Sequence, residues 1–381
     1  MRILIAPDSF KGSLTAREVA DNIEKGILKV YPAAEIYKLP LADGGEGTVD
    51  ALIYARNGKK VFKEVTGPLA KPVKAFFGIL EDEKTAVIEM AAASGLALLS
   101  AEEKNPLQAT SFGTGELIKA ALDEGVEKII IGLGGSATVD GGVGLAQALG
   151  ISFKDKRGQE VPFGGQALVD IETIDLGGLD KRLKDLEIVI ASDVTNPLYG
   201  ANGAAYVFGP QKGATEEMVS ILDAGLRNLA RVIEKETGKA VGHLAGAGAA
   251  GGVGAALMAF LQARMESGID LILDLNNIDN ILKKVDLVIT GEGRIDRQTL
   301  MGKTPYGVAR RARKFKVPVI GIAGSVESEV MSDLNQYFTA VFSIIKEAVS
   351  LEEAMANSQE WLQLTSQQVL QVQKLTAKNI L

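Results

Sequence analysis

The sequence contains no cysteine and a single histidine, His243, among its 381 residues. The absence of cysteine excludes disulfide bonds, thiolate metal sites and thiol nucleophiles. A lone histidine argues against a histidine-based triad or a multi-histidine metal site, and we expect His243 to be a structural hydrogen-bond partner. Acid–base chemistry therefore falls to carboxylates, lysine, tyrosine or bound water.

The chain also lacks a basic block, and its formal net charge is −7. This balance argues against nucleic acid or an anionic membrane as a partner. Leu244–Leu261 carries no charge over a near-membrane length, but its many glycines and alanines predict a packed loop and helix rather than a membrane span. The first residues form a strand pattern without the layout of a secretory leader, so we expect a cytoplasmic protein.

What the chain has in abundance is glycine, with 43 residues that gather in loops beside hydroxyls and acids. The densest stretch, Gly132–Gly142, follows the β-branched run Ile129–Ile131, which predicts a buried strand. Glycines let backbone amides approach an oxyanion, so the stretch predicts a phosphate-binding loop. Its candidate binding residues are Gly132, Gly134, Gly135, Ser136 and Thr138. The alternative is a tight turn that binds nothing.

Two segments match the dinucleotide fingerprint in part. Gly132-x-Gly134-x-x-Ala137 fits its variant form but lacks the acid about 20 residues further on that should bind the ribose. Gly246-x-Gly248-x-x-Gly251 fits letter for letter, but no strand precedes it. Neither match alone indicates a dinucleotide site.

Polar residues follow several predicted strands directly, where doubly wound α/β proteins bind their ligands. Turn formation and helix capping are the competing explanations for them. The strands end near residues 6, 39, 191 and 290, and the polar residues beyond them are Asp8 and Lys11, then Asp43, then Ser192, Asp193, Thr195 and Asn196, then Arg294, Asp296 and Lys303. Thr110 and Ser111 form another hydroxyl-rich loop before a predicted helix.

The pattern changes near residue 66, where three alternating segments predict meandering strands of a second domain. The β-α units after about residue 285 resemble those at the N-terminus. We therefore predict an α/β protein with a discontinuous, doubly wound, Rossmann-like parallel-sheet domain, residues 1–65 and 285–381, and an inserted mixed α/β domain, residues 66–284. Residues 200–214 predict a loop, a short strand and a loop, with Lys212 near the end.

Seven stretches resemble the type I glycerate kinases, from end to end and in family order. They are Ala6-Pro-Asp-Ser-Phe-Lys-Gly-Ser-Leu-Thr, Pro40-Leu-Ala-Asp-Gly-Gly-Glu-Gly-Thr, Thr110-Ser-Phe-Gly-Thr-Gly-Glu-Leu-Ile, Gly132-Leu-Gly-Gly-Ser-Ala-Thr-Val-Asp-Gly-Gly, Ser192-Asp-Val-Thr-Asn-Pro-Leu, Phe208-Gly-Pro-Gln-Lys-Gly-Ala and Asp286-Leu-Val-Ile-Thr-Gly-Glu-Gly-Arg-Ile-Asp. The resemblance implies ATP-dependent phosphorylation of D-glycerate, giving 2-phosphoglycerate in most bacterial members. It also implies a flavodoxin-like domain with an inserted domain likened to restriction enzymes.

Phosphoryl transfer needs positioned reactants, cations, a metal ion and a proton acceptor. We expect the Gly132–Gly142 loop, Thr110, Ser111 and Lys303 to bind ATP, and Lys11 and Asp8 to act at the transferred group. Asp193 is the predicted general base, and Asp43 or Asp296 the predicted Mg²⁺ ligand. Arg294, Asp43, Asp296, Ser192, Thr195 and Asn196 are the predicted substrate-binding residues.

We further expect ATP and glycerate to meet in a cleft between the two domains, in a monomer or homodimer. The alternatives are 3-phosphoglycerate as product, a kinase of another small hydroxy acid, a dehydrogenase, or a non-catalytic sensor of a sugar acid or nucleotide.

Overall fold

The computed structural model describes residues 1–378, and the chain divides into two compact units. The first unit contains residues 1–43, 50–56 and 269 onward, and the second contains residues 44–49 and 57–268. The sequence analysis placed the two main crossings near residues 66 and 285. In the structure the segment after residue 56 already belongs to the sheet of the second unit, and residues from 269 pack in the first.

The first unit contains a five-stranded sheet in the order β15-β13-β11-β1-β2, and every neighbouring pair is parallel. This is the flavodoxin-type order. From β1, the chain adds β2 on one side of the sheet and then β11, β13 and β15 in turn on the other side, so the direction of strand addition switches between β1 and β11. The predicted parallel sheet is therefore confirmed. Its strands are β1 (Arg2–Ile5), β2 (Glu35–Lys38), β11 (Leu287–Thr290), β13 (Val319–Ala323) and β15 (Ala340–Ser343), beside a small pair β12 (Arg294–Ile295) and β14 (Ser325–Val326).

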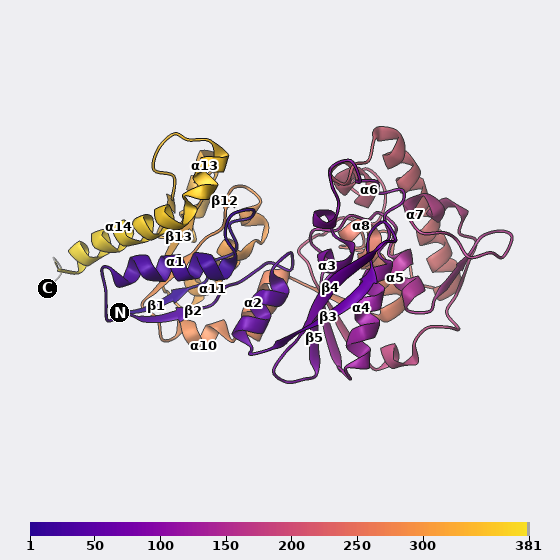
Figure 1. Cartoon of the computed structure of the whole chain (residues 1–381), viewed down its shortest axis with the longest axis horizontal. Helices are drawn as coiled ribbons and strands as arrows, with labels where there is room; N and C mark the ends of the chain where they lie inside the picture. The colour runs from indigo at the N-terminus through magenta and orange to yellow at the C-terminus, as the bar shows by residue number, and fades with distance from the viewer. Residues whose placement is uncertain (379–381) are drawn as a thin grey trace. The chain divides into compact units, whose positions relative to one another are not determined.

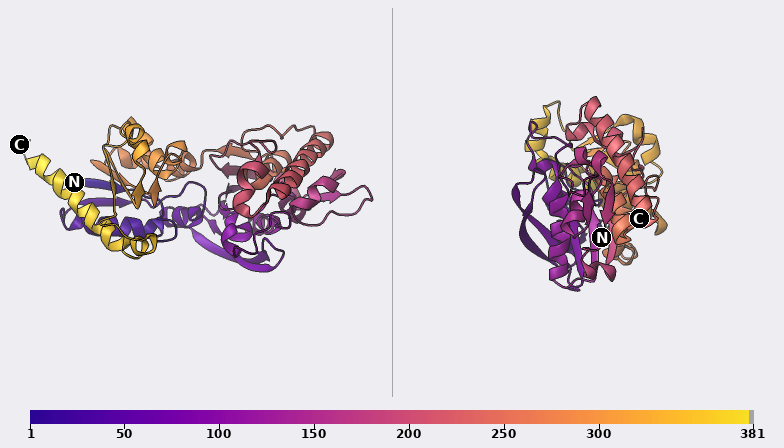
Figure 2. Two further views of the ribbon diagram at one scale, coloured as in Figure 1. Left: turned by 90° about the horizontal axis from the view of Figure 1, so that it is seen from above. Right: turned by 90° about the vertical axis from the view of Figure 1, so that its right-hand side faces the viewer.

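Helices pack on the sheet of the first unit because its strands are apolar on both faces. Ile3 and Ile5 lie in one core with Ile23 and Trp361, whereas Leu4 between them is buried outside this core. The helices are α1 (Ala16–Leu28), α2 (Thr48–Ala55), α9 (Gly268–Leu275), α10 (Ile278–Leu282), α11 (Thr304–Lys314), α12 (Met331–Leu334), α13 (Leu351–Ala356) and α14 (Ser358–Lys378), with 3₁₀ turns at Thr299–Met301 and Ser328–Val330. Helices α1 and α14 lie side by side (Figures 1 and 2).

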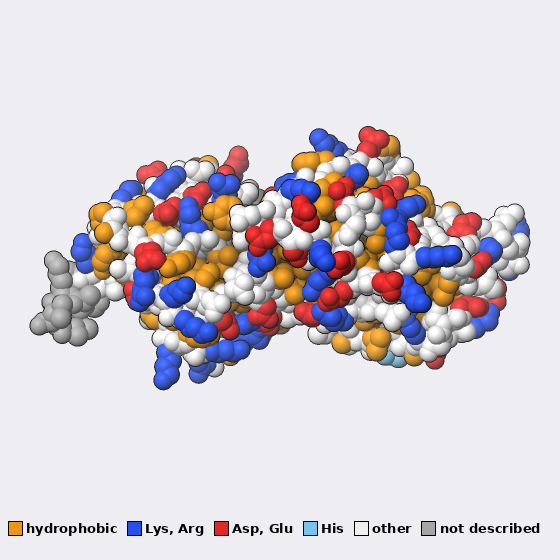
Figure 3. Space-filling view, turned by 90° about the horizontal axis from the view of Figure 1, so that it is seen from below, with side chains coloured by type: hydrophobic (Ala, Val, Ile, Leu, Met, Phe, Trp, Pro, Cys, Tyr) orange, Lys and Arg blue, Asp and Glu red, His pale blue; other side chains and the backbone are white. Residues whose placement is uncertain are grey.

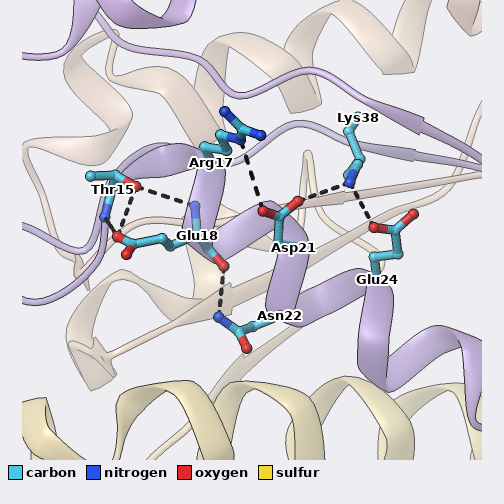
Figure 4. Close-up of polar contacts among 7 residues, drawn as sticks. All are labelled: Thr15, Arg17, Glu18, Asp21, Asn22, Glu24 and Lys38. Atoms are coloured by element: carbon cyan, nitrogen blue, oxygen red, sulfur yellow. Dashed lines mark hydrogen bonds and ion pairs between the residues drawn. The ribbon is translucent and has the colours of Figure 1, made fainter.

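Helix α1 has strong local signals for its start (Figure 4). The Thr15 side chain accepts a hydrogen bond from the Glu18 amide, and the Glu18 carboxylate accepts one from the Thr15 amide. This capping box satisfies amides that the helix itself leaves unpaired. Lys38 of β2 then bonds to the helix through Asp21 at 2.8 Å and Glu24 at 2.7 Å.

The second unit contains a six-stranded mixed sheet in the order β10-β9-β6-β5-β4-β3. The four strands from β10 to β5 are parallel, and β4 and β3 are antiparallel additions. Its strands are β3 (Lys59–Thr66), β4 (Pro72–Ile79), β5 (Thr85–Glu89), β6 (Lys128–Gly132), β9 (Glu187–Ala191) and β10 (Arg264–Glu266), beside the hairpin β7 (Ser152–Lys154) and β8 (Thr173–Asp175).

The helices of the second unit fill two apolar clusters, one against the sheet and one around the longest helix. They are α3 (Ala91–Ser94), α4 (Phe112–Asp123), α5 (Val143–Ala148), α6 (Ala204–Phe208), α7 (Glu216–Thr237) and α8 (Ala249–Leu261), with 3₁₀ turns at Leu96–Leu98, Gly165–Asp170, Lys181–Lys184 and Pro210–Lys212. The expected short strand within residues 200–214 is wrong, because Ala204–Phe208 forms helix α6. Ala204 and Ala205 are buried in the second cluster while Tyr206 and Val207 are exposed, and so short an apolar run does not distinguish strand from helix.

The apolar run Leu244–Leu261 is a loop followed by α8, as its composition predicted. Within the described residues, no helix is both long and apolar enough to cross a membrane.

We predict that Gly26→Ala destabilises the first unit, although alanine is the better helix former. A Cβ at Gly26 on α1 would lie 2.5 Å from the carbonyl oxygen of Gln363 and 2.7 Å from Ser366 Cβ on α14. Overpacking of this kind costs about 1–3 kcal/mol, against a helix-propensity gain of about 1 kcal/mol. Thermal and urea unfolding measure the difference, with exposed Lys25→Ala as the control on the same helix. A variant as stable as the parent would contradict the close packing of α1 on α14.

Candidate functional site

In the first unit, the point where the strand order reverses lies between β1 and β11. The segments that follow these two strands are joined there, because the Asp8 amide donates to the Gly291 carbonyl at 2.8 Å. Asp8 and Glu292 therefore emerge side by side at the carboxyl end of the sheet. Open α/β sheets bind their ligands at this position.

Asp8 is bonded on both carboxylate oxygens. Thr304, the first residue of α11, donates its hydroxyl to Asp8 Oδ2 at 2.6 Å, and the Ser9 amide donates to Oδ1 at 2.6 Å. Burial, and after it the charge of Asp43, raises the pKa of Asp8 above its usual range. The surroundings of Asp8 therefore do not fully compensate a negative charge on its carboxylate.

Glu292 is 7% exposed and accepts a hydrogen bond from the Thr299 hydroxyl at 2.5 Å. Lys303 Nζ lies 3.8 Å from its other oxygen. Burial raises the pKa of Glu292 to about 7, and the charges of Asp8 and Asp43 add to the effect. Asp8, Asp43 and Glu292 therefore form an acidic cluster with Lys303 beside it.

The sequence analysis did not include Glu292 among its candidates. Its signal was present, because Glu292 lies between two glycines directly after a buried strand, the same position that drew attention to Arg294.

Arg294 and Asp296 form a separate, more exposed group. The Arg294 side chain is 65% exposed and lies 3.6 Å from both Asp296 and Glu327. Asp296 also accepts a hydrogen bond from the Gln298 amide at 2.8 Å, which stabilises a turn. Lys11 is exposed in the loop after β1.

In the second unit, several glycines of the Gly132–Gly142 loop serve close backbone packing. A Cβ at Gly132 would lie 2.3 Å from the Gly44 oxygen, and one at Gly134 would lie 2.7 Å from Gly45 Cα. On another side, a Cβ at Gly251 would lie 2.0 Å from the Thr138 oxygen. Gly251 has a φ of +69°, so the second fingerprint match is a kinked helix start that packs against this loop.

Asp140 occupies the end of this loop with its side chain buried. It accepts hydrogen bonds from the Ser111 amide and hydroxyl, both at 2.8 Å, and from the amides of Gly142 at 3.1 Å and Gly144 at 3.3 Å. Thr110 is buried as well, and its hydroxyl accepts from the Phe112 amide at 3.2 Å. The hydrogen-bond donors of Ser111 and of the start of α5 are therefore bonded to the Asp140 carboxylate within the chain.

Lys212, at the end of the 3₁₀ turn Pro210–Lys212, contacts this loop, and the sequence analysis did not select it as a site residue. Its side chain is buried, and Nζ donates to Ser136 Oγ at 2.9 Å and to the Thr138 carbonyl at 2.7 Å. Burial lowers the pKa of Lys212 to about 7. Only its place in the stretch Phe208–Ala214 pointed to it, since lysine in a polar loop is normally exposed.

The loop exposes Gly134 and Gly135 at its apex, whereas Ser136 and Thr138 are buried. Within residues 1–378, the amides of Gly134 and Gly135 form no hydrogen bond with the chain, and Thr138 Oγ1 is buried without a partner. The apex is therefore the part of the loop that can offer amides to an anion.

The residues after β9 lie at the carboxyl end of the second sheet. Asp193 is exposed, and its Oδ2 accepts from the Gly268 amide at 3.2 Å. Ser192 Oγ accepts from the Val194 amide, and Asn196 donates to the Asn202 carbonyl. Thr195 is exposed.

Among the described residues, no group of three or more histidine, aspartate or glutamate side chains is arranged to hold a metal ion. Mg²⁺ keeps several waters and takes one or two carboxylates together with substrate phosphates, so it does not require such a group. Asp8 and Asp43 offer carboxylate oxygens as metal ligands, and the repulsion between their charges fits a bound cation.

On the face drawn in Figure 3, acidic and basic side chains are interspersed over each unit.

A flavodoxin-type sheet with an acidic cluster at its switch point, and a second sheet with a glycine loop bonded to a buried lysine, define an α/β protein with a candidate site in each unit. The chain belongs to the glycerate kinase family, whose sequence profile matches residues 3–374, and it is accordingly a kinase.

Named relatives agree with the family assignment. The chain is 51% identical to Glycerate kinase of Bacillus subtilis over 97% of both chains, and 53% identical to Glycerate 2-kinase of Escherichia coli over 93% of both. The crystal structure that carries the name glycerate kinase 2, from Salmonella typhimurium LT2, has a TM-score of 0.88, 50% identity and 99% coverage of both chains. The predicted family and α/β fold class are confirmed.

We predict that the acidic cluster makes the protein less stable as pH rises toward neutrality. The folded protein holds a proton on Glu292 that the unfolded chain loses near pH 4.5, the ordinary pKa of a glutamate side chain, and releases it only near pH 7. Folding therefore takes up a proton between these values, and the free energy of unfolding falls as pH rises through the window.

Glu292→Gln should remove this decrease in the free energy of unfolding with rising pH, because the glutamine amide still accepts a hydrogen bond from Thr299 and cannot ionise. At pH 8 the variant should be more stable than the parent by about 1–3 kcal/mol, and the two should converge near pH 5. Urea unfolding across this pH range measures both curves, with exposed Glu329→Gln as the control. Parallel curves for Glu292→Gln and the parent would contradict the assignment.

Proposed function

We propose that the protein transfers the γ-phosphoryl group of ATP, with Mg²⁺, to O2 of D-glycerate and forms 2-phosphoglycerate. The observation that carries this proposal is the 53% identity to Glycerate 2-kinase over 93% of both chains. The acidic cluster and the glycine loop support it, because phosphoryl transfer needs groups that bind a metal cation and groups that bind phosphates.

The Gly132–Gly142 loop is our proposed binding element for the ATP phosphates. Gly134 and Gly135 would donate their exposed amides, and Ser136 and Thr138 would shape the loop from within. Thr110 and Ser111 support the loop in this proposal, because their hydroxyls are buried in internal hydrogen bonds. Lys303 is the proposed cation for a phosphate at the acidic cluster, where it lies near Glu292.

Asp43 is the proposed magnesium ligand, with Asp8 adjacent to it. Mg²⁺, when bound, supplies positive charge that offsets the charge of the phosphate oxygens. Asp296 is the weaker candidate, because one of its oxygens holds a turn and the other faces Arg294.

Arg294 and Asp193 are the residues we assign to glycerate. The planar guanidinium of Arg294 is exposed and suits a two-point bond to the glycerate carboxylate. Asp193 is exposed at a strand end and would accept the proton of the attacking hydroxyl, with Ser192, Thr195 and Asn196 around it and Lys11 shielding the transferred group. An alternative acceptor, another small hydroxy acid, would use the same residues.

The reaction is tested by phosphorus NMR of the purified protein with Mg²⁺, ATP and D-glycerate. We expect a new phosphomonoester signal split into a doublet by the single proton on C2. A triplet from two protons would mean phosphate on O3 and would overturn the regiochemistry alone. Untouched ATP and no new ester would overturn the kinase assignment for glycerate.

Asp193→Asn should lower kcat by about 10²–10⁴-fold, because an amide cannot accept the hydroxyl proton. The fold should persist, since the amide oxygen still accepts from Gly268. Steady-state kinetics measure the loss, and exposed Asp170→Asn in the same unit is the matched control. Near-normal turnover in Asp193→Asn would remove it from the role of base.

A further inference from the structure

Lys212 is a lysine whose ammonium group lies inside the second unit rather than in water. It is 2% exposed, at the end of the 3₁₀ turn Pro210–Lys212. Burying an ammonium group costs several kcal/mol unless its bonds and charge are compensated. An apolar side chain of similar length would fill the same space without that cost, so the contacts of Nζ require an explanation.

Both hydrogen bonds of Nζ go to one segment. The acceptors are Ser136 Oγ at 2.9 Å and the Thr138 carbonyl at 2.7 Å, and both lie within three residues after the exposed apex Gly134–Gly135. The apex has only glycine backbone, which does not hold one conformation by itself. A single donor group that binds two points of the adjacent segment restricts how the apex is presented.

The positive charge of Lys212 has no direct counter-charge. Within the described part of the chain, no carboxylate lies within ion-pair distance of Nζ. Asp140 is the acid whose field reaches it, but the Asp140 carboxylate is itself bonded to Ser111, Gly142 and Gly144. The backbone and Cβ of Lys104 pack against Gly213, the residue after Lys212, and this contact brings no carboxylate to Nζ.

We propose that Lys212 is a positioning residue for nucleotide binding: it fixes the segment Ser136–Thr138 from the buried side, so that the amides of Gly134 and Gly135 face the ATP phosphates. The inference rests on the proposed role of this loop in ATP binding. Lys212 acts through the loop and through its charge, and does not itself touch the ligand.

A proton linkage follows from the same geometry. Burial lowers the pKa of Lys212 to about 7, so near pH 8 much of the free protein holds it as a neutral amine. Phosphate charge at the apex favours the ammonium form. Nucleotide binding should then take up a proton in this pH range.

The first test compares Lys212→Met with the parent in steady-state kinetics. We expect KM for ATP to rise about tenfold to a hundredfold, the effect of losing hydrogen bonds from a charged donor, while KM for glycerate stays unchanged. Lys239→Met is the matched control, because Lys239 Nζ donates to the Ala259 carbonyl, away from the loop. An unchanged KM for ATP in Lys212→Met, or an equal rise in both variants, would overturn the proposal.

The second test needs no folded variant. Calorimetric titration of the parent with ATP in excess Mg²⁺ at pH 8, in buffers of different ionisation enthalpy, should show proton uptake. If Lys212→Met folds, its uptake should be lost. No uptake by the parent, or the same uptake by the variant, would overturn the proposal. Because this titration uses ATP without glycerate, failure of glycerate phosphorylation and failure of the Lys212 inference are observed separately.

Discussion

The second unit depends on three backbone segments meeting without side chains between them. The loop after β6 is in contact with Gly44–Gly45 on one side and with Gly251–Gly252 on another, at separations that leave no room for a Cβ. Such contacts require glycine on at least one of the two segments, and they place the ends of β6 and β9 in a fixed relation to the loop. Gly132 and Gly134, which the sequence analysis predicted to bind phosphate, are thus required for close packing against other backbone segments of the chain.

Both units bury ionisable side chains, and the second unit buries Lys212 together with the carboxylates of Glu89, Asp140 and Asp223. The first unit gathers Asp8, Asp43 and Glu292, and burial, with neighbouring negative charges after it, raises the pKa of Asp8 and of Glu292 above the usual range. The second unit buries the single ammonium group of Lys212. Both arrangements are costly alone and become favourable when a ligand supplies the missing charge. A cation would suit the first, and phosphate charge near the second would favour the ammonium form of Lys212, as the proposed magnesium-dependent phosphoryl transfer requires.

Much of the architecture could be predicted from the sequence, and the polar interior could not. Period-2 and β-branched segments predicted the strands, and the predicted strand ends placed Asp8 and Asp193 shortly after β1 and β9, where the structure has them. The burial of Lys212 could not be predicted, because it depends on a turn from residue 210 reaching a loop more than 70 residues earlier. The internal use of Ser111 by Asp140 likewise joins positions 29 residues apart. Helix α6 was missed because a five-residue apolar run has no period.

The order of strands in the first sheet has a consequence for how the chain is made. Strands β1 and β2 leave the ribosome early, but β11, the other neighbour of β1, begins only at Leu287. At about 5–20 residues per second, the delay is on the order of 10–50 s. During synthesis β1 therefore presents one unpaired edge, while residues 57–268 can already collapse into a nearly contiguous unit. The capping box and the bonds of Lys38 to α1 are contacts that this early fragment can form without the rest of the chain.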